Sequence, residues 1–162
     1  MSLSGYLTLS GTKRGPIPGS VIQKGREGSI EVIAFYHTLV APRDPASGRP
    51  TGKRMHKPFS VTKQLDRSTP FLHDVLTHNE NLTNVTLRLF RPSPAGIERH
   101  AFTVSLINAT IASINLRMMN TRHPRLSKLP ELEEVSFAYQ RIEWTWLDGN
   151  LTADDDWEIA RH

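Results

Sequence analysis

The sequence predicts a mainly β fold, a small β-barrel of two antiparallel sheets with one short α-helix packed on its side. Several segments alternate apolar and polar residues, as strands do when one face lies on a core. The longest, LEEVSFAYQRIEWTW at 132–146, changes its apolar residues from odd to even positions. This phase slip indicates a bulge near Gln140–Arg141. Bulged, twisted strands of this length are typical of small barrels.

Shorter strands are expected along the rest of the chain. Tyr6–Leu9 is a short first strand, and Ser29–Val40 is apolar on both alternating faces, which predicts a strand covered on both sides. Other alternating apolar sets are Phe59, Val61 and Leu65; Val85, Leu87 and Leu89; Phe102, Val104 and Leu106; and Ile114, Leu116 and Met118. The stretch 97–119 is too long for one flat strand, so we expect it to bend or break near Asn108.

One helix is expected at about 69–78. Ser68 or Thr69 can cap its start, and Pro70 suits its first turn. Its narrow apolar stripe indicates that it packs on the barrel wall. The residues of the stripe are Phe71, Leu72, Val75 and Leu76.

Length and composition favour a single domain over residues 1–162. The chain has no cysteine, which excludes disulfides and thiolate chemistry. No apolar run approaches the roughly 18 residues of a membrane helix, so we expect no membrane insertion. The first 14 residues make a poor secretory signal. We therefore expect synthesis in the cytoplasm, and any export without a cleaved signal peptide.

The net charge of +4 conceals two regions of opposite sign. Residues 1–130 hold 18 Lys and Arg against 7 Asp and Glu, whereas residues 131–162 hold 2 against 9. This division favours contact between copies, or an acidic end folded onto the basic face of its own chain. We hypothesise that the acidic end and the basic stretches 49–57 and 121–128 lie at different contact surfaces, so that association weakens with salt.

We predict no catalytic, cofactor-binding or metal-binding residues. The seven histidines form no HxH or HExxH pair, and Asp154–Asp156 lacks the alternating ligands and turning glycine of a calcium loop. Two alternatives remain open. A carboxylate-based hydrolase would use Glu143 and Asp148, although nothing in the sequence places them across a cleft. A nucleic-acid-binding barrel would use the basic stretch 49–57, which lacks interleaved aromatic residues.

Five segments, in this order, resemble one known family. They are EGSIEVIAFYHTL at 27–39, TGKRMHKPFSVTKQLD at 51–66, STPFL at 68–72, LRLFRPSPAGIERHAFTVSLINATIASI at 87–114, and FAYQRIEWTWLDG at 137–149 with DDDW at 154–157. Together they resemble the Hcp family, the hemolysin-coregulated tube protein of bacterial type VI secretion. The stretch 42–52 and the segment Asn120–Leu132 match less well.

The resemblance implies a small β-barrel with a helix at its side, which forms hexameric rings. The rings would stack into the hollow inner tube of the secretion apparatus, and the protein would be secreted. Implied partners are other copies of the chain, the sheath, spike and baseplate proteins, and small effector proteins in the lumen. The family pattern includes no catalytic residue and no cofactor, and implies no nucleic acid partner.

Overall fold

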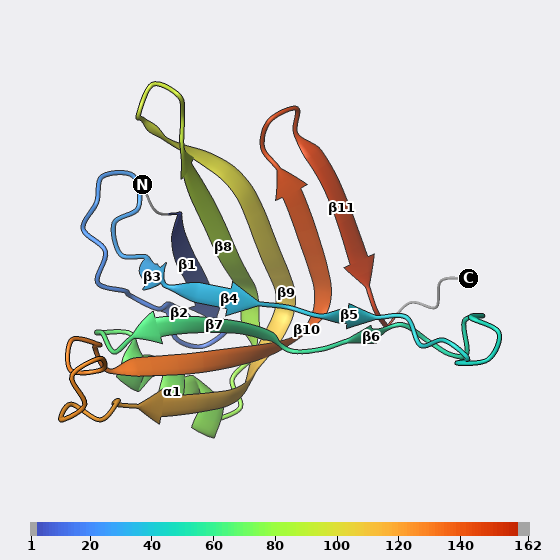
Figure 1. Ribbon diagram of the computed structural model, residues 1–162, viewed down its shortest axis with the longest axis horizontal. Coiled ribbons are helices and arrows are strands. Elements are labelled where there is room, and N and C mark those ends of the chain that lie inside the picture. The colour runs from blue at the N-terminus through green and yellow to red at the C-terminus, as the bar shows by residue number, and fades with distance from the viewer. Residues whose placement is uncertain (1–2, 159–162) are drawn as a thin grey trace.

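Antiparallel strands make up most of the molecule, seen in a computed structural model that describes residues 3–158 (Figure 1). In chain order the elements are β1 (Ser4–Gly11), β2 (Gly15–Pro16), β3 (Ile30–Val32), β4 (Ala34–Tyr36), β5 (Leu39–Val40), β6 (Met55–His56), β7 (Phe59–Gln64), α1 (Thr69–Thr77), β8 (Leu82–Pro92), β9 (Glu98–Arg117), β10 (Leu132–Trp146) and β11 (Leu151–Asp156). The prediction of a mainly β fold with antiparallel sheets and one short helix is confirmed.

The main sheet brings its two ends together through a single segment. Pairing runs in the order β1-β8-β9-β10-β7-β4, and β3 pairs back onto β1. Only Ile33 separates β3 from β4, and its backbone N–H donates to the Thr62 carbonyl of β7 at 2.8 Å. The segment 30–36 therefore hydrogen-bonds to β1 with its first half and to β7 with its second.

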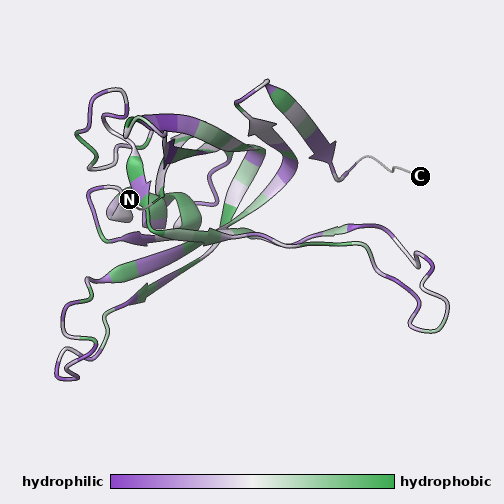
Figure 2. Ribbon diagram, turned by 45° about the horizontal axis from the view of Figure 1, so that its top comes forward, coloured by the Kyte–Doolittle hydropathy of each residue, from purple (hydrophilic) through white to green (hydrophobic). Residues whose placement is uncertain are grey.

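A second, two-stranded sheet of β5 and β6 begins a long arm, defined here as residues 38–57. The arm projects well beyond the body of the molecule (Figures 1 and 2). Near its tip, Arg43 and Pro50 form an isolated backbone bridge, which keeps the two halves of the arm together. The arm thus extends the β4–β7 hairpin away from the core.

One apolar core fills the interior, and the expected alternating residues supply most of it. Every strand of the main ladder except β4 contributes, and so does the helix. Its most buried members include Leu7, Leu9, Ile30, Val32, Phe59, Val61, Leu72, Val75, Val85, Leu87, Val104, Leu106, Val135, Phe137 and Ile142. Three residues expected in these strands, Leu65, Leu116 and Met118, are exposed instead, because they lie at or beyond the strand ends.

The phase slip in β10 is real, but the bulge lies elsewhere. Phe137 and Tyr139 are buried at odd positions, and Ile142 is buried at an even position. The shift of register between β9 and β10 falls between Ser136 and Phe137, several residues before the predicted Gln140–Arg141. The change of buried face coincides instead with an unusual residue on the neighbouring strand.

That residue is Asn108, in the middle of β9. Its φ of 56° is left-handed, and its side-chain amide donates to Gln140 Oε1 at 2.8 Å. Asparagine tolerates this conformation better than most residues. β9 continues unbroken through Asn108 and bends in its middle part (Figure 1), as expected for a stretch of this length.

The helix spans Thr69–Thr77, close to the predicted 69–78, and packs against β9. Leu72 and Val75 are buried, and Phe71 is half-exposed, so the stripe is narrower than expected. The predicted side-chain cap is wrong. Ser68 makes no capping hydrogen bond; the Ser68 N–H donates to Asp66 Oδ1 at 2.8 Å.

A buried ion pair crosses from β7 to β10 near the start of the helix. Lys63 and Glu133 are directly opposite each other, both fully buried, with Nζ and Oε1 2.9 Å apart. Lys63 Nζ also lies 3.1 Å from Asp66 Oδ1, which ties the pair to the turn before α1. Among residues 3–158, Glu133 Oε2 has no hydrogen-bond partner.

Candidate assembly surface and polar cluster

The segment that joins the two ends of the main sheet leaves an apolar surface exposed. Ile33, Phe35, Tyr36 and Leu39 are 53%, 41%, 59% and 47% exposed. The sequence predicted cover on both faces of this strand, and within the chain that prediction is wrong. The helix packs against β9 and does not supply the missing cover.

The pleat does not continue straight through this segment. Val32 pairs with Gly5 on one side, and after the bend at Ile33, Phe35 pairs with Val61 on the other. The Phe35 ring stacks on Phe59, with centroids 5.6 Å apart. The exposed residues therefore lie on both sides of a bend in the joining segment and do not form one continuous outer stripe.

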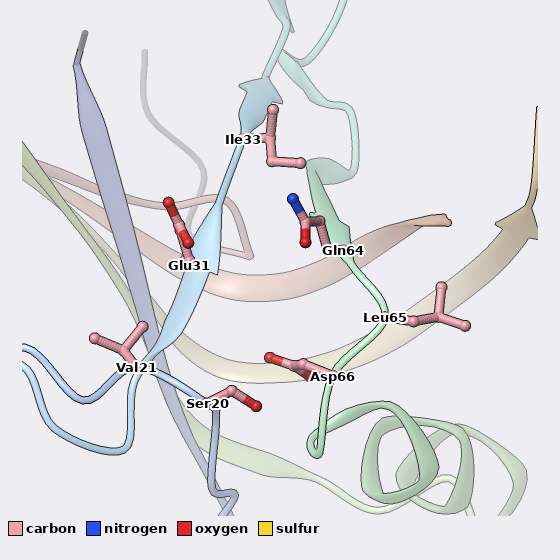
Figure 3. A pocket seen from close by; sticks show the side chains of 7 residues that line it. All are labelled: Ser20, Val21, Glu31, Ile33, Gln64, Leu65 and Asp66. Carbon is pink, nitrogen blue, oxygen red and sulfur yellow. The ribbon is translucent and has the colours of Figure 1, made fainter. Parts of the chain in front are cut away.

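Two pockets flank this segment. One, of about 230 Å³, is mostly apolar; Leu3, Val32, Phe35 and Leu89 are among the residues that line it. The other, of about 270 Å³, is more polar, and Figure 3 shows Glu31 and Gln64 facing it from opposite sides. Ile33 lines both pockets, so it stands at the centre of this surface.

A cluster of polar side chains fastens the root of the arm to β10 and β11. The Tyr139 hydroxyl lies 2.6 Å from His37 Nε2 and 2.7 Å from His56 Nδ1. His56 Nε2 lies 2.7 Å from Asp155 Oδ2, and the Arg54 guanidinium donates two hydrogen bonds to the same carboxylate, at 2.5 and 2.9 Å.

The aromatic ring of Trp157 closes this cluster. It stacks on His56 with centroids 6.0 Å apart, and its indole N–H donates to the Tyr139 carbonyl. These contacts join two of the five segments that carry the family resemblance, 51–66 and the chain end. The spacing of residues 37, 56, 139 and 155 gave no sign that they would meet.

The environment of the cluster shifts the pKa values of three ionisable groups. Burial raises the pKa of the Tyr139 hydroxyl, and the nearby Asp155 charge adds to this. Burial also lowers the pKa of His37, as does the charge of His56. The hydrogen bonds from Arg54 hold the pKa of Asp155 below its usual range. The carboxylate is therefore ionised at neutral pH, and Tyr139 keeps its proton.

The acidic end folds onto the basic part of its own chain, one of the two arrangements expected from the charge division. Asp155 pairs with Arg54 of the basic stretch 49–57, and Asp154 accepts from Arg141 Nε at 3.1 Å. The sequence did not predict that this end is a strand, β11, paired with β10. The other basic stretch, 121–128, lies at the opposite end of the molecule from the arm (Figures 1 and 2).

The two carboxylates of the hydrolase alternative do not share a cleft. Asp148 lines a cleft of about 390 Å³ together with Arg91 and Trp146, and Glu143 is not part of its lining. Glu143 instead accepts a hydrogen bond from Arg141 at 3.4 Å. Within residues 3–158, no three His, Cys, Asp or Glu side chains are arranged to hold a metal ion. No helix in this part of the chain is long and apolar enough to cross a membrane.

The comparison with known families agrees with the resemblance seen in the sequence. Residues 6–146 match the family described as "Type VI secretion system effector, Hcp". The chain belongs to the Hcp family. The "Major exported protein" of Pseudomonas aeruginosa is 37% identical, with 97% of this chain and 96% of that protein aligned.

Solved structures of the Hcp family share the fold. One, described as an Hcp protein, superposes with a TM-score of 0.90 at 30% identity, over 98% of this chain and all of that one. A double mutant of Hcp1 from the E. coli EAEC 042 pathovar superposes with a TM-score of 0.85 at 35% identity, over 96% of this chain and 99% of that one. The secreted protein Hcp3 from Pseudomonas aeruginosa superposes with a TM-score of 0.78 at 30% identity, over 96% of this chain and 99% of that one.

Proposed function

We propose that this Hcp family protein is a structural subunit of the type VI secretion tube. Copies close into hexameric rings, and the rings stack into a hollow tube whose lumen admits small effector proteins. The tube is made in the cytoplasm and leaves the cell without a cleaved signal peptide, in contact with sheath, spike and baseplate proteins. The protein acts through its shape and has no catalytic role.

The observation that carries this proposal is the apolar surface around the joining segment. Ile33 and Phe35 are exposed beside an apolar pocket, on the segment that connects both ends of the sheet. Fully burying an exposed side chain of this kind contributes about 1.5–3 kcal/mol, and these two, already about half buried, can each add a part of that to association. In a ring each copy presents two different surfaces to its neighbours, so the same gain recurs at every contact.

Ile33 is the side chain with which to test this contact. It is half-exposed, so Ile33→Lys should leave the fold of the single chain intact. At a buried contact the new ammonium loses water without gaining a partner, which opposes association. We expect Ile33→Lys to shift the protein from rings to monomers in size-exclusion chromatography with mass detection.

Ile22→Lys is the matched control, because Ile22 is 92% exposed in a segment outside the strands. It introduces the same charge, and we expect it to leave the rings intact. If Ile33→Lys and the unsubstituted protein formed rings of equal mass, the joining segment would not be part of the contact between copies. Circular dichroism of both variants checks that each one is folded.

A further inference from the structure

Four side chains form an unbroken path of hydrogen bonds from the root of the arm to β11. They are His37, Tyr139, His56 and Asp155, with successive distances of 2.6, 2.7 and 2.7 Å. The His56 side chain is 2% exposed, so water does not readily replace its partners. The path therefore restricts where its protons can be.

With no added proton, one arrangement keeps every hydrogen bond of the path. The ionised Asp155 can only accept, so His56 Nε2 must carry a hydrogen. In neutral His56 the other nitrogen, Nδ1, then accepts from the Tyr139 hydroxyl. The oxygen of that hydroxyl accepts in turn from His37 Nε2–H.

A first added proton on His37 Nδ1 leaves this arrangement intact, whereas a proton on His56 gives a second arrangement that also keeps every bond of the path. His56 becomes cationic and donates from both nitrogens, to Asp155 and to the Tyr139 oxygen. The Tyr139 hydroxyl turns and donates to His37 Nε2, which is now an acceptor. His37 stays neutral but moves its hydrogen to Nδ1, so the change in His56 also changes the tautomer of His37.

A second added proton leaves the path with one donor too many. Both imidazoles then donate to the single Tyr139 oxygen, and the hydroxyl hydrogen has no acceptor left in the path. Two positive charges face each other across one oxygen atom, and each disfavours the other. Losing the acceptor of a buried donor is costly as well.

The carboxylates nearest the path already have partners. Asp155 already pairs with Arg54, and the Asp156 carboxylate accepts from Gln140 Nε2 at 3.2 Å. On the β7 side His37 packs against the uncharged Phe59 ring, while a backbone contact with Lys57 favours its protonation. The surface pocket beside His56 is lined by Lys53, Lys57 and Glu158, a net positive set.

We propose that this path is a proton-operated latch on the arm. It holds the arm against β10 and β11 with no added proton or one, and releases the arm when both imidazoles are cationic. Burial and the charge of His56 lower the pKa of His37, so release occurs at a pH below the ordinary histidine value of about 6.5. The lowered pKa of Asp155 keeps its carboxylate ionised over this range.

Hydrogen exchange of the full-length protein tests the latch. Amide protection factors, corrected for the intrinsic pH dependence of exchange, are measured for residues 38–57 at pH 7.5 and 4.5. We expect protection to fall at least ten-fold at pH 4.5. In His37→Gln the side-chain oxygen can still accept from Tyr139 but cannot take a proton, so the arm should stay protected at both pH values.

His78→Gln is the control, because His78 is an exposed helix-end histidine and its loss should leave the pH response unchanged. Equal protection of the arm at both pH values, or an equal fall in His37→Gln, would overturn the proposal. Long-range ¹⁵N NMR of the histidine rings gives a second reading on the unsubstituted protein. The latch requires both rings to be cationic over the pH range in which the arm loses protection, and a His37 ring that stays neutral while protection falls would also overturn it.

Discussion

Lys63 and Glu133 place opposite charges inside an apolar core, where each depends on the other. Both side chains are fully buried and 2.9 Å apart. Removing one member of such a pair leaves an uncompensated charge, which typically costs 3–5 kcal/mol. We expect Lys63→Met to lower the free energy of unfolding by about this amount, measured by urea denaturation at a fixed protein concentration.

Replacing both members tests whether the loss of stability comes from the unpaired charge that a single substitution leaves behind. The double substitution Lys63→Met with Glu133→Leu removes both charges, and we expect it to recover most of the lost stability. Lys128→Met, at an exposed lysine, is the control and should change little. If Lys63→Met were as stable as the control, the ion pair would not matter to the fold.

Asp155 makes stability depend on pH in a defined direction. Its pKa is lowered by Arg54 in the folded chain, so the folded state binds this proton more weakly than the unfolded state. While the arm is held, the contribution of Asp155 to stability is therefore complete above the unfolded value of about 3.9 and is lost as the pH falls through the folded pKa. We expect Asp155→Asn to be destabilised at pH 7 and the difference from the unsubstituted protein to narrow below pH ~4. Thermal unfolding of both proteins across this pH range measures the difference in stability. A difference that stays constant with pH would contradict a lowered pKa for Asp155.

At the scale of the elements, the bend in β9 depends on one residue. Asn108 holds a left-handed backbone, which costs most residues about 1–2 kcal/mol. We expect Asn108→Ala to lose roughly this amount, along with the hydrogen bond to Gln140. Asn108→Gly removes the strain and should be the more stable of the two in urea denaturation. The reverse order would mean that the side-chain bond, rather than the backbone, sets the bend.

Most elements could be predicted because local signals and burial agree. Pro70 and the spacing of Leu72 and Val75 placed the helix within one residue of its observed end. Period-two apolar residues placed β8 and the first half of β9. The phase slip in β10 was predicted correctly, although the bulge assigned to it lies nearer Ser136.

The remaining features depend on contacts between distant segments. β11 is rich in aspartate, which disfavours strands, and it forms because β10 offers a pairing edge. The polar cluster joins residues 37 and 155, and no local pattern connects them. Lys63 did leave a signal, because it shares its parity with the buried Phe59 and Val61.

At the scale of the whole molecule, the charge division acts partly within one chain. Asp155 pairs with Arg54, so this acidic charge is already compensated before any copies meet. Arg122, Arg125 and Lys128 of the other basic stretch make no ion pair with residues 3–158. We therefore expect salt to weaken mainly the contacts that the stretch 121–128 makes between copies. The apolar surface around Ile33 should keep the ring together at high salt.

The mass of the unsubstituted protein in solution shows whether its copies close into a ring. Size-exclusion chromatography with mass detection, supported by electron micrographs of the eluted peak, distinguishes a ring from a single chain. We predict a species of six times 18.3 kDa and annular particles. A species of 18.3 kDa at high protein concentration, with no annular particles, would exclude the proposed ring.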